Sequence, residues 1–283
     1  GSKLALIYAE IAKKKLYDLK DKFNIGEISI KKIKTDGDEI QDTRLSDTGG
    51  KGLFLKKIED ELINNKIDLA VHALKDMPSI ETDGLITKCF LERNDAREVL
   101  ISKNKKILKD QKKGALIGTS SFRREFQVKY IRNNLNFKLI RGNVDTRIKK
   151  LKEGLYDGII LSLTGVKFLG LEENISQVFS TSDIIPSVGQ GVIALQCRKN
   201  DLEIQNILKN INHVQTELCV ITERNILKIL EGDCDTEIGA YAKLENGKIS
   251  VEAELFSLDG TKRYFVKSSK EPQHAEKLGK EVG

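Results

Sequence analysis

Short apolar runs alternate with amphipathic stretches over the first two thirds of the chain, and this alternation is the strongest constraint on its fold. Residues 53–63 and 122–131 carry apolar side chains at helical spacing. Around them lie short apolar runs bounded by turn or capping residues, at 69–74, 115–118, 138–140 and 158–163. Strands that alternate with helices predict an α/β fold with mostly parallel sheets. Ligands of such sheets bind beyond the carboxyl ends of the strands, close to helix N-termini.

The last part of the chain has a different pattern. Residues 248–255 alternate apolar and polar side chains with period two, a Leu-Asp-Gly-Thr turn occupies 258–261, and a second alternating run continues through Val266. This pattern predicts an antiparallel hairpin, followed by a helix from about Pro272. We therefore expect a small α+β unit at the C-terminal end, beginning near the change of pattern at residues 205–215.

Composition excludes several classes of protein. Hydrophobic residues make up 39% and charged residues 32% of the 283 residues, a profile typical of soluble globular proteins of about two domains. No run approaches the roughly 20 apolar residues that span a bilayer, so we expect no membrane span. Four cysteines without a C-x-x-C pair and only three histidines argue against a metal site or a disulfide framework and favour a reducing, cytoplasmic compartment. The sequence does not begin with Met, which leaves a removed targeting segment, and thus an organelle, open.

Two segments place polar groups where a turn is expected. Residues 48–54 form a glycine-rich stretch that contains Lys51 and opens a predicted helix, so its backbone N–H groups can bind an anion or simply cap the helix. The apolar residues 70–74 lead directly to Lys75 and Asp76. An aspartate beside a lysine at a strand end can stay ionised in a cleft and stabilise positive charge on a substrate, or it can cap the next turn. The residues alone do not decide between an anion site and a helix cap at 48–54, or between the two roles of Asp76.

Four arginines follow two further apolar runs. Arg123 and Arg124 fall in the first turn of a predicted helix, after three hydroxyl residues at 119–121, and Arg141 and Arg147 follow the next run. Cations are unfavourable at the positive end of a helix dipole, so the first pair predicts an anion between its members. Guanidinium groups bind carboxylates bidentately, and four of them in one cleft predict a ligand with several carboxylates or phosphates.

Nucleic acid is the competing polyanion, and the net charge of +6 is compatible with it. Against it, aromatic residues make up only 6% of the chain and tryptophan is absent. The sequence also has no aromatic-basic stacking platform and no helix-turn-helix pattern. We therefore expect no nucleic-acid partner.

Cys234 stands apart from the other cysteines because it lies in a polar, glycine-bearing segment, residues 230–239. An exposed loop cysteine is a candidate nucleophile or attachment point, whereas a core cysteine is inert. Its neighbours Asp233 and Asp235 should raise the pKa of the thiol, which argues against a freely reactive thiolate. A permanent covalent load fits this setting better.

Taken in order, these segments resemble the hydroxymethylbilane synthase (porphobilinogen deaminase) family over nearly the whole chain. Besides the cysteine segment, the matching motifs are G-S-K-L-A-L at 1–6, G-G-K-G-L-F at 49–54, A-V-H-A-L-K-D-M-P at 70–78, G-T-S-S-F-R-R at 118–124, R-G-N-V-D-T-R at 141–147 and P-S-V-G-Q-G at 186–191. One such motif would be weak, but so many in order are highly specific.

The resemblance implies a fold of three domains. Two are α/β domains like those of periplasmic binding proteins, and the third is a small α+β domain that carries the cysteine. Their expected limits are 1–91 with 192–209, 97–185, and 214–283. Hinge motion is expected where the α/β domains are joined, near residues 92–97 and 186–192.

The resemblance also implies an activity, that of a transferase. Such an enzyme joins four porphobilinogen molecules head to tail with loss of ammonia, on a dipyrromethane cofactor held by Cys234 through a thioether. Water then releases the linear tetrapyrrole hydroxymethylbilane for the next enzyme of tetrapyrrole (heme) biosynthesis. A monomer is expected.

Site residues follow from the same resemblance. Asp76 is expected to protonate the leaving amine or to hold its positive charge. The residues expected to contact the cofactor, besides Cys234, are Ser2, Lys75, Asp76, Thr119, Ser120, Ser121, Arg123, Arg124, Arg147 and Gly165. Those expected to contact the substrate are Lys51, Phe54, Lys56, Arg141, Arg147 and Gln190.

Several positions depart from the family's pattern. Ala73 stands where the family often has serine. Phe168 comes directly after T-G-V-K at 164–167, where the family often has an arginine, and its presence removes one carboxylate anchor. Asp233 and Asp235 make the cysteine segment more acidic than is usual. The main alternative function is a non-enzymatic two-domain binding protein for a polycarboxylate ligand, because such folds also serve solute receptors.

Overall fold

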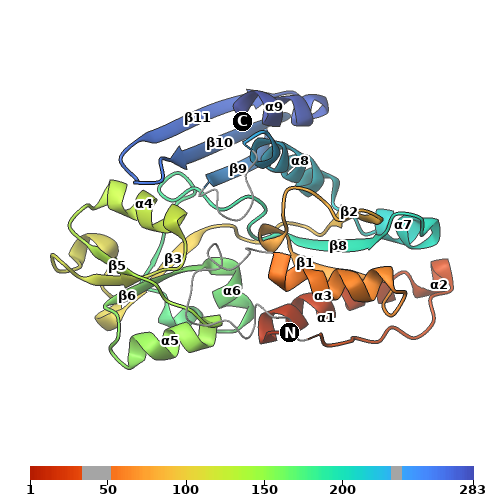
Figure 1. Cartoon of the computed structure of the whole chain (residues 1–283), viewed down its shortest axis with the longest axis horizontal. Coiled ribbons are helices and arrows are strands. Elements are labelled where there is room, and N and C mark those ends of the chain that lie inside the picture. Colours follow the sequence, from red (N-terminus) through yellow and green to blue (C-terminus); the bar gives the residue numbers. More distant parts are fainter. Residues whose placement is uncertain (34–51, 231–237) are drawn as a thin grey trace.

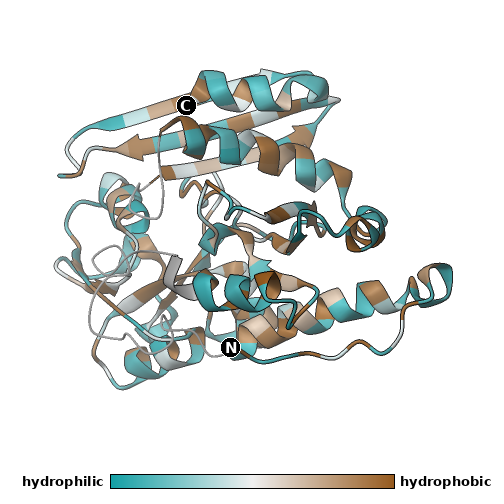
Figure 2. Ribbon diagram, turned by 45° about the vertical axis from the view of Figure 1, so that its right-hand side comes forward, coloured by the Kyte–Doolittle hydropathy of each residue, from teal (hydrophilic) through white to brown (hydrophobic). Residues whose placement is uncertain are grey.

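Three β-sheets organise the part of the chain that the structure describes (Figure 1). The computed structural model describes residues 1–33, 52–230 and 238–283, with the side chains of residues 52–54 excepted. In Figure 2 the helices around the sheets carry both hydrophobic and hydrophilic residues, as expected of amphipathic helices that cover a sheet on one side.

The first sheet has the order β1-β8-β2, formed by β1 (Ala70–Ala73), β8 (Ile193–Arg198) and β2 (Leu85–Phe90), and both of its pairings are antiparallel. Around it lie α1 (Lys3–Tyr17), α3 (Gly52–Ile63) and α7 (Leu202–Lys209). Helix α1 packs Ala12 and Leu16 against Leu195 and Cys197 of the central strand. All of β8 except its last residue is buried, which explains its nearly continuous apolar sequence.

The second sheet has the order β5-β4-β6-β3-β7. Its strands are β3 (Glu98–Ser102), β4 (Leu116–Gly118), β5 (Asn136–Lys138), β6 (Gly158–Ser162) and β7 (Gln177–Val178). Helices α4 (Phe122–Ile131), α5 (Val144–Lys152) and α6 (Leu163–Phe168) follow strands β4, β5 and β6. Both faces of this sheet are covered, since neighbouring residues of β6 pack into different cores: Ile159 with α5, and Ile160 with Val128 of α4.

The third sheet is antiparallel, in the order β11-β10-β9, and its strands are β9 (Ile238–Glu245), β10 (Lys248–Phe256) and β11 (Arg263–Lys270). Helices α8 (Val214–Ile229) and α9 (Ala275–Val282) pack against it, and a short 3₁₀ turn, η7 (Pro272–His274), precedes α9. The helices touch at Gly279, where a Cβ atom would lie 2.3 Å from the backbone oxygen of Thr222. This close contact requires glycine.

Two crossover segments join the first and second sheets. Residues 92–97 lead from β2 to β3, and residues 186–192 lead back to β8. They lie side by side, because the N–H of Asn94 donates to the backbone oxygen of Gly191 at 2.8 Å. Gly191 has φ +83°, and a Cβ atom there would lie 2.5 Å from the backbone oxygen of Asn94, so only glycine fits.

Most elements lie where the sequence predicts them, including the helix at 122–131 and the C-terminal hairpin. The expectation of mostly parallel sheets is wrong for the described strands. Only the pairings of β4 with β5 and with β6 are parallel. Strand β3 is the first strand after the chain enters the second sheet, and β8 is the first after the chain returns to the first sheet. Both run antiparallel to their described neighbours.

The strand expected at 138–140 lies two residues earlier, as β5 (Asn136–Lys138). Ile140 is apolar because it is buried in the core with α5, and not because it pairs in the sheet.

Candidate active site

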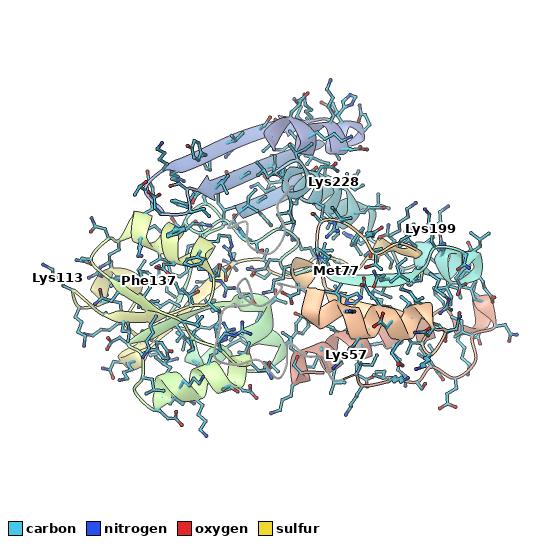
Figure 3. The ribbon with its side chains drawn as sticks, in the orientation of Figure 1. Lys57, Met77, Lys113, Phe137, Lys199 and Lys228 are labelled. Carbon is cyan, nitrogen blue, oxygen red and sulfur yellow. The ribbon has the colours of Figure 1, made fainter. Side chains whose placement is uncertain are left out.

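Lys75 and Asp76 lie where the first sheet meets the crossovers. Strand β1 ends at Ala73, and a 3₁₀ turn, η3 (Leu74–Asp76), follows. The turn is fixed by Leu74, which is 1% exposed and donates its N–H to the backbone oxygen of Val192 at 3.0 Å. Asp76 itself is exposed. Figure 3 shows Met77, the next residue, in the middle of the molecule, whereas Lys113 and Lys199 lie toward its rim.

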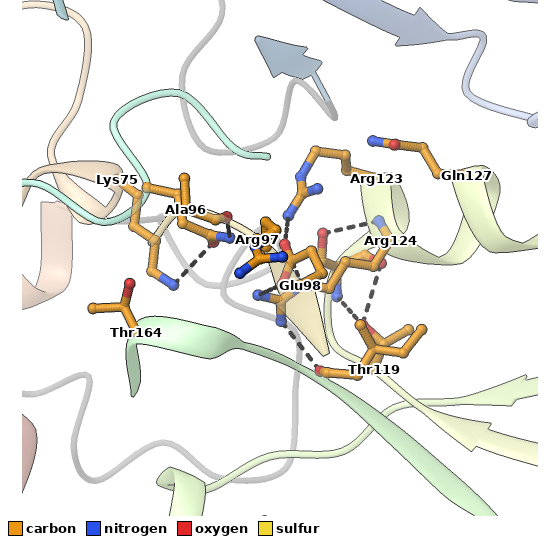
Figure 4. Close-up of polar contacts among 12 residues, drawn as sticks. Lys75, Ala96, Arg97, Glu98, Thr119, Arg123, Arg124, Gln127 and Thr164 are labelled. Atoms are coloured by element: carbon orange, nitrogen blue, oxygen red, sulfur yellow. Dashed lines mark hydrogen bonds and ion pairs between the residues drawn. The ribbon is translucent and has the colours of Figure 1, made fainter. Parts of the chain in front are cut away.

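The ammonium group of Lys75 is held between the sheets. Its Nζ donates to Oε1 of Gln190 at 3.4 Å, and Nε2 of Gln190 donates to the backbone oxygen of Ala96 at 2.7 Å (Figure 4). Burial lowers the pKa of Lys75, Asp76 acts in the opposite direction, Arg124 lowers it, and the net value is about 8. Lys75 therefore changes its charge near pH 8, well below the pH at which an ordinary surface lysine does.

An arginine pair surrounds a buried carboxylate from β3 (Figure 4). Nη2 of Arg123 lies 2.6 Å from Oε1 of Glu98, and Nη2 of Arg124 lies 3.0 Å from Oε2. Glu98 is 0% exposed. Burial raises the pKa of Glu98, but Arg124 and Arg123 outweigh this effect and bring it to about 2. The anion that the sequence predicted between these arginines is thus found within the chain itself.

Backbone groups hold the same arginines in place. Nη1 of Arg123 donates to the backbone oxygen of Ile185 at 2.6 Å, and Nη1 of Arg124 donates to that of Ile160 at 3.3 Å. Ser121 caps α4 by accepting from the N–H of Arg124 at 3.3 Å. Two guanidinium groups against one carboxylate leave a net charge of +1 (2 − 1) at this point of the molecule.

Arg147 and Arg141 add cations from the second sheet. Arg147 is half-buried, and its Nε donates to the backbone oxygen of Gly142 at 2.7 Å. Burial and the charges of Arg124 and Arg141 lower the pKa of Arg147 and Asp76 acts in the opposite direction, so that the net value is about 10. Burial also lowers the pKa of Arg141. The charge of Arg147 is therefore influenced by Arg124, Arg141 and Asp76 together.

The small polar residues of the expected site are mostly used in helix starts. Oγ of Ser2 accepts from the N–H of Ala5 at 3.2 Å and so caps α1. Thr119 is 1% exposed and accepts from the N–H of Ser121, while Ser120 between them is half-buried. Their hydroxyl groups lie at the N-terminus of α4, beside the arginine pair.

The remaining expected residues are placed less closely or not at all. Gly165 lies in α6, where a Cβ atom would be 3.6 Å from Leu4 of α1. Lys56 is exposed on α3, and Phe54 belongs to the same helix, but its side chain is not described. Lys51 and Cys234, with Asp233 and Asp235, lie outside the described residues.

The structure adds Tyr8, which the sequence did not single out. Tyr8 of α1 is 8% exposed, and its ring meets that of Phe168 edge-on, with 5.5 Å between ring centroids. Burial raises the pKa of Tyr8, and the neighbouring Asp76 adds to this effect. The contact joins α1 of the first sheet to α6 of the second beside the exposed aspartate.

Strand β9, which follows the cysteine segment, packs against Ile185, a backbone partner of Arg123. Gly239 near the start of β9 forms a bridge with Ser187, and a Cβ atom at Gly239 would lie 2.9 Å from the backbone oxygen of Ile185. The same oxygen accepts from Nη1 of Arg123 and, at 3.0 Å, from Nε2 of Gln127. One backbone oxygen therefore connects α4 of the second sheet to β9 of the third.

Within the described parts of the chain, no group of three or more His, Cys, Asp or Glu side chains could hold a metal ion. No described helix is long and apolar enough to cross a membrane.

Two helix-covered sheets joined by paired crossovers, with cations gathered near an exposed aspartate, define a two-lobed α/β protein suited to an anionic substrate. Comparison with known families identifies which one. Residues 1–206 match the model "Porphobilinogen deaminase, dipyromethane cofactor binding domain", and residues 217–283 match "Porphobilinogen deaminase, C-terminal domain". The chain belongs to the porphobilinogen deaminase family.

Curated relatives agree. The chain is 41% identical over 286 residues to the porphobilinogen deaminase of Chloroherpeton thalassium, with 100% of this chain and 90% of the relative covered. It is 43% identical over 286 residues to that of Syntrophomonas wolfei, with 100% and 91% covered. The chain is therefore an enzyme, a hydroxymethylbilane synthase that polymerises porphobilinogen with a dipyrromethane cofactor, and the alternative of a non-enzymatic binding protein is not favoured.

Solved structures that are similar to this chain include the following two. One is the VFT2 domain of BvgS from Bordetella pertussis, with a TM-score of 0.44, 12% identity, and 72% of this chain and 76% of that one covered. The other is the probable amino-acid ABC transporter extracellular-binding protein ytmK of Bacillus subtilis, with a TM-score of 0.42, 14% identity, and 72% and 81% covered.

Proposed function

We propose that Asp76 is the catalytic residue of this enzyme and that it acts at the exposed end of β1. Loss of ammonia from porphobilinogen creates positive charge next to the pyrrole ring, which a carboxylate can stabilise after protonating the leaving amine. The observation that carries the proposal is the placement of Asp76: it is exposed, yet the turn before it is fixed by the buried Leu74. A fixed backbone at this point limits the reorganisation needed to bring the carboxylate to the substrate.

The pyrroles of substrate and cofactor carry acetate and propionate groups, and we propose that the gathered cations bind these carboxylates. Arg147, Arg141 and Lys75 would bind them directly, with the N-terminal hydroxyl groups of α4 as further donors. Arg123 and Arg124 would contribute the net positive charge that remains after pairing with Glu98. This donor set fits a dipyrromethane, which is rich in carboxylates. When bound, the cofactor supplies a tethered pyrrole carbon as the nucleophile.

We further propose that Cys234 carries the cofactor through a thioether. The other three cysteines are poor candidates because each is buried. Burial raises the pKa of Cys89 to about 12 and the pKa of both Cys197 and Cys219 to about 11, which disfavours the thiolate. The segment that contains Cys234 lies between α8 and β9, and β9 packs beside the arginine pair.

We assign the domains as residues 1–91 with 192–209, 97–185, and 214–283, with hinge motion at the crossovers. Three separate sheets, each with a core of its own, support these limits, although Val220 of α8 also packs with Leu74 and Ala194 of the first domain. We also propose that the enzyme acts as a cytoplasmic monomer and passes its product to the next enzyme of tetrapyrrole biosynthesis. A single species near 31.8 kDa in sedimentation would support the monomer, and a stable dimer would exclude it.

The decisive experiment combines intact mass with turnover. An added mass of two linked pyrroles, mapped to the Cys234 peptide, and loss of that mass in Cys234→Ala would support the attachment. Asp76→Asn should keep the cofactor and lose nearly all turnover. Asp60→Asn is the matched control, because Asp60 is an exposed aspartate on α3. Full turnover in Asp76→Asn would overturn the assignment of the catalytic residue.

A further inference from the structure

A chain of hydrogen-bonded side chains runs beneath β1 and ends at a histidine that the proposed reaction does not use. His72 lies on β1, four residues before Asp76. We propose that Glu59, acting through Gln196, fixes the proton of His72 on Nε2, and that this chain positions the end of β1 that carries Lys75 and Asp76. The second part rests on the proposed role of Asp76; the first part does not.

The contacts are short and shielded from water. Nε2 of His72 lies 3.0 Å from Oε1 of Gln196, and Nε2 of Gln196 lies 2.8 Å from Oε1 of Glu59. The hydroxyl of Thr82 donates to Oε2 of Glu59 at 2.7 Å. His72, Gln196 and Glu59 are 7%, 0% and 8% exposed, so water competes little for these hydrogen bonds.

The chemistry of the partners gives this chain one direction. A carboxylate only accepts hydrogen bonds, so the group of Gln196 that faces Glu59 must be its NH₂. The amide oxygen of Gln196 then faces His72, and an oxygen can only accept. Nε2 of His72 must therefore donate, which selects one of the two neutral tautomers of the ring.

The surroundings of His72 keep the ring neutral near pH 7. Burial lowers the pKa of His72, whereas its hydrogen bond to Gln196 and the charges of Glu59 on α3 and Asp76 on its own segment raise it, and burial prevails. A neutral His72 adds no positive charge beside Asp76. His72 therefore contributes no change of charge beside Asp76 over the pH range in which an ordinary histidine titrates.

The same chain fixes β1 against its neighbours. His72 pairs with Ala194 of β8, so its bond to Gln196 crosses diagonally to a residue two places along that strand. Glu59 connects this pair to α3, the helix that the glycine-rich segment opens in the sequence. Strand, neighbouring strand and helix are thus joined by three side chains, of which His72 lies three residues before Lys75 and four before Asp76.

The test is the tautomer of His72 in the holoenzyme, read by nitrogen-15 NMR of histidine-labelled protein. The chain has only three histidines, and His213→Asn and His274→Gln assign the other two signals. We expect a single neutral form of His72 protonated on Nε2. A ring protonated on Nδ1, or doubly protonated at pH 7, would overturn the inference whatever the role of Asp76.

Two variants distinguish a specific effect of Glu59 on the tautomer of His72 from a general loss of structure. Glu59→Gln keeps the shape but allows residue 59 to donate, so Gln196 can reverse and the Nδ1-protonated form of His72 should appear. Thr82→Val is the matched control: it removes the other partner of Glu59 but leaves an acceptor-only carboxylate, so the tautomer should not change. If Glu59→Gln leaves a single Nε2-protonated ring, Glu59 does not set the donor and acceptor roles in this series of hydrogen bonds.

Turnover tests the positioning role. In Glu59→Gln we expect kcat to fall about tenfold, with KM for porphobilinogen unchanged within about twofold, because misplacement of Asp76 affects the reaction more than binding. Thr82→Val should keep nearly full kcat. A shifted tautomer in Glu59→Gln with unchanged kcat would overturn the positioning role alone, and Asp76→Asn measured in parallel tests the catalytic assignment separately.

Discussion

Arg93 and Glu223 form a buried ion pair in which Nη1 lies 2.6 Å from Oε1 and Nη2 lies 3.0 Å from Oε2. Arg93 belongs to the first crossover, and its Nε also donates to the backbone oxygen of Gln190 in the second at 2.9 Å. Glu223 of α8 also accepts from the backbone N–H groups of Gly189, at 2.8 Å, and Ala242, at 2.7 Å. One ion pair thus ties both crossovers to the third sheet.

Removing one partner of this pair should destabilise the whole molecule. Arg93→Leu leaves the carboxylate of Glu223 buried without its cation, and we expect the free energy of unfolding to fall by about 3–5 kcal/mol. Urea unfolding measures this change. Lys280→Ala, which removes an exposed pair with Glu276, is the control and should leave the urea midpoint nearly unchanged. Similar midpoints for both variants would show that the buried pair contributes little.

The buried carboxylate of Glu98 leads to a prediction about acid stability. Its pKa in the folded protein is about 2, below the ordinary 4.5, so its stabilising effect is complete above pH 4.5 and is lost as the pH falls through 2. Glu98→Gln leaves Arg123 and Arg124 without their carboxylate and should lower the free energy of unfolding by about 3 kcal/mol at pH 7.

The difference between Glu98→Gln and the wild type should shrink as the pH falls from 4.5 toward 2, because protonation then removes the same charge from the wild type. Urea titrations at several pH values measure it. Glu252→Gln is a control with an exposed lysine partner, Lys267, and should show a much smaller change. A difference that does not depend on pH would contradict the assigned pKa.

Glu98 also shows what the sequence could and could not predict. Repeating apolar patterns placed the helix at 122–131 and the C-terminal hairpin correctly, because periodicity reports which face is buried. The cation pair at 123 and 124 correctly predicted a nearby anion. The local sequence could not show whether that anion is a ligand or a side chain from a distant part of the same chain. A single Glu opening an apolar run, as at 98–102, was the only sign of the partner.

Other features depend on contacts that are far apart in the sequence. Tyr8 follows the apolar face of α1 and looks like an ordinary core residue, and only the fold brings it to Phe168 and near Asp76. The general expectation of parallel sheets fails at β8 for the same reason. Its apolar run fits any strand buried on both faces, and pairing with β1 is decided by the path of the chain through the second sheet.

Lys75 predicts a pH dependence of substrate capture. Since its pKa in the free enzyme is about 8, its ammonium group is present below this pH and lost above it. If it binds a substrate carboxylate, kcat/KM should fall as the pH rises through 8, because kcat/KM reports the groups of the free enzyme.

Lys75→Arg tests which group causes this decrease. A guanidinium stays protonated, so this variant should lose the decrease near pH 8 even if its absolute kcat/KM is lower. The pH dependence of the free energy of unfolding gives an independent check on the pKa of Lys75. Between pH 8 and the ordinary 10.5, the unfolded chain holds a proton that folded Lys75 has released, so the contribution of Lys75 to stability should rise with pH in this window. An alkaline decrease that persists in Lys75→Arg would assign it to another group.

The contact between the crossovers can be tested at a single glycine. Gly191 has φ +83°, and a Cβ atom there would lie 2.5 Å from the backbone oxygen of Asn94. Gly84 has nearly the same backbone angle, φ +80°, but nothing lies within 4 Å of its Cβ position. Alanine at either site suffers the same strain of a left-handed backbone, about 1 kcal/mol. Only alanine at Gly191 must also push the two crossovers apart.

Comparison of Gly191→Ala with Gly84→Ala therefore isolates the crossover contact. We expect Gly191→Ala to unfold at a clearly lower urea concentration than Gly84→Ala, by about 1–3 kcal/mol in free energy, since a backbone oxygen cannot move aside as a side chain can. Gly191→Ala should also lose turnover, because the crossovers set the distance between Asp76 on the first sheet and the arginines on the second, whereas Gly84→Ala should keep it. Equal stability and equal turnover in the two variants would mean that the crossovers separate freely and do not hold the two sheets in register.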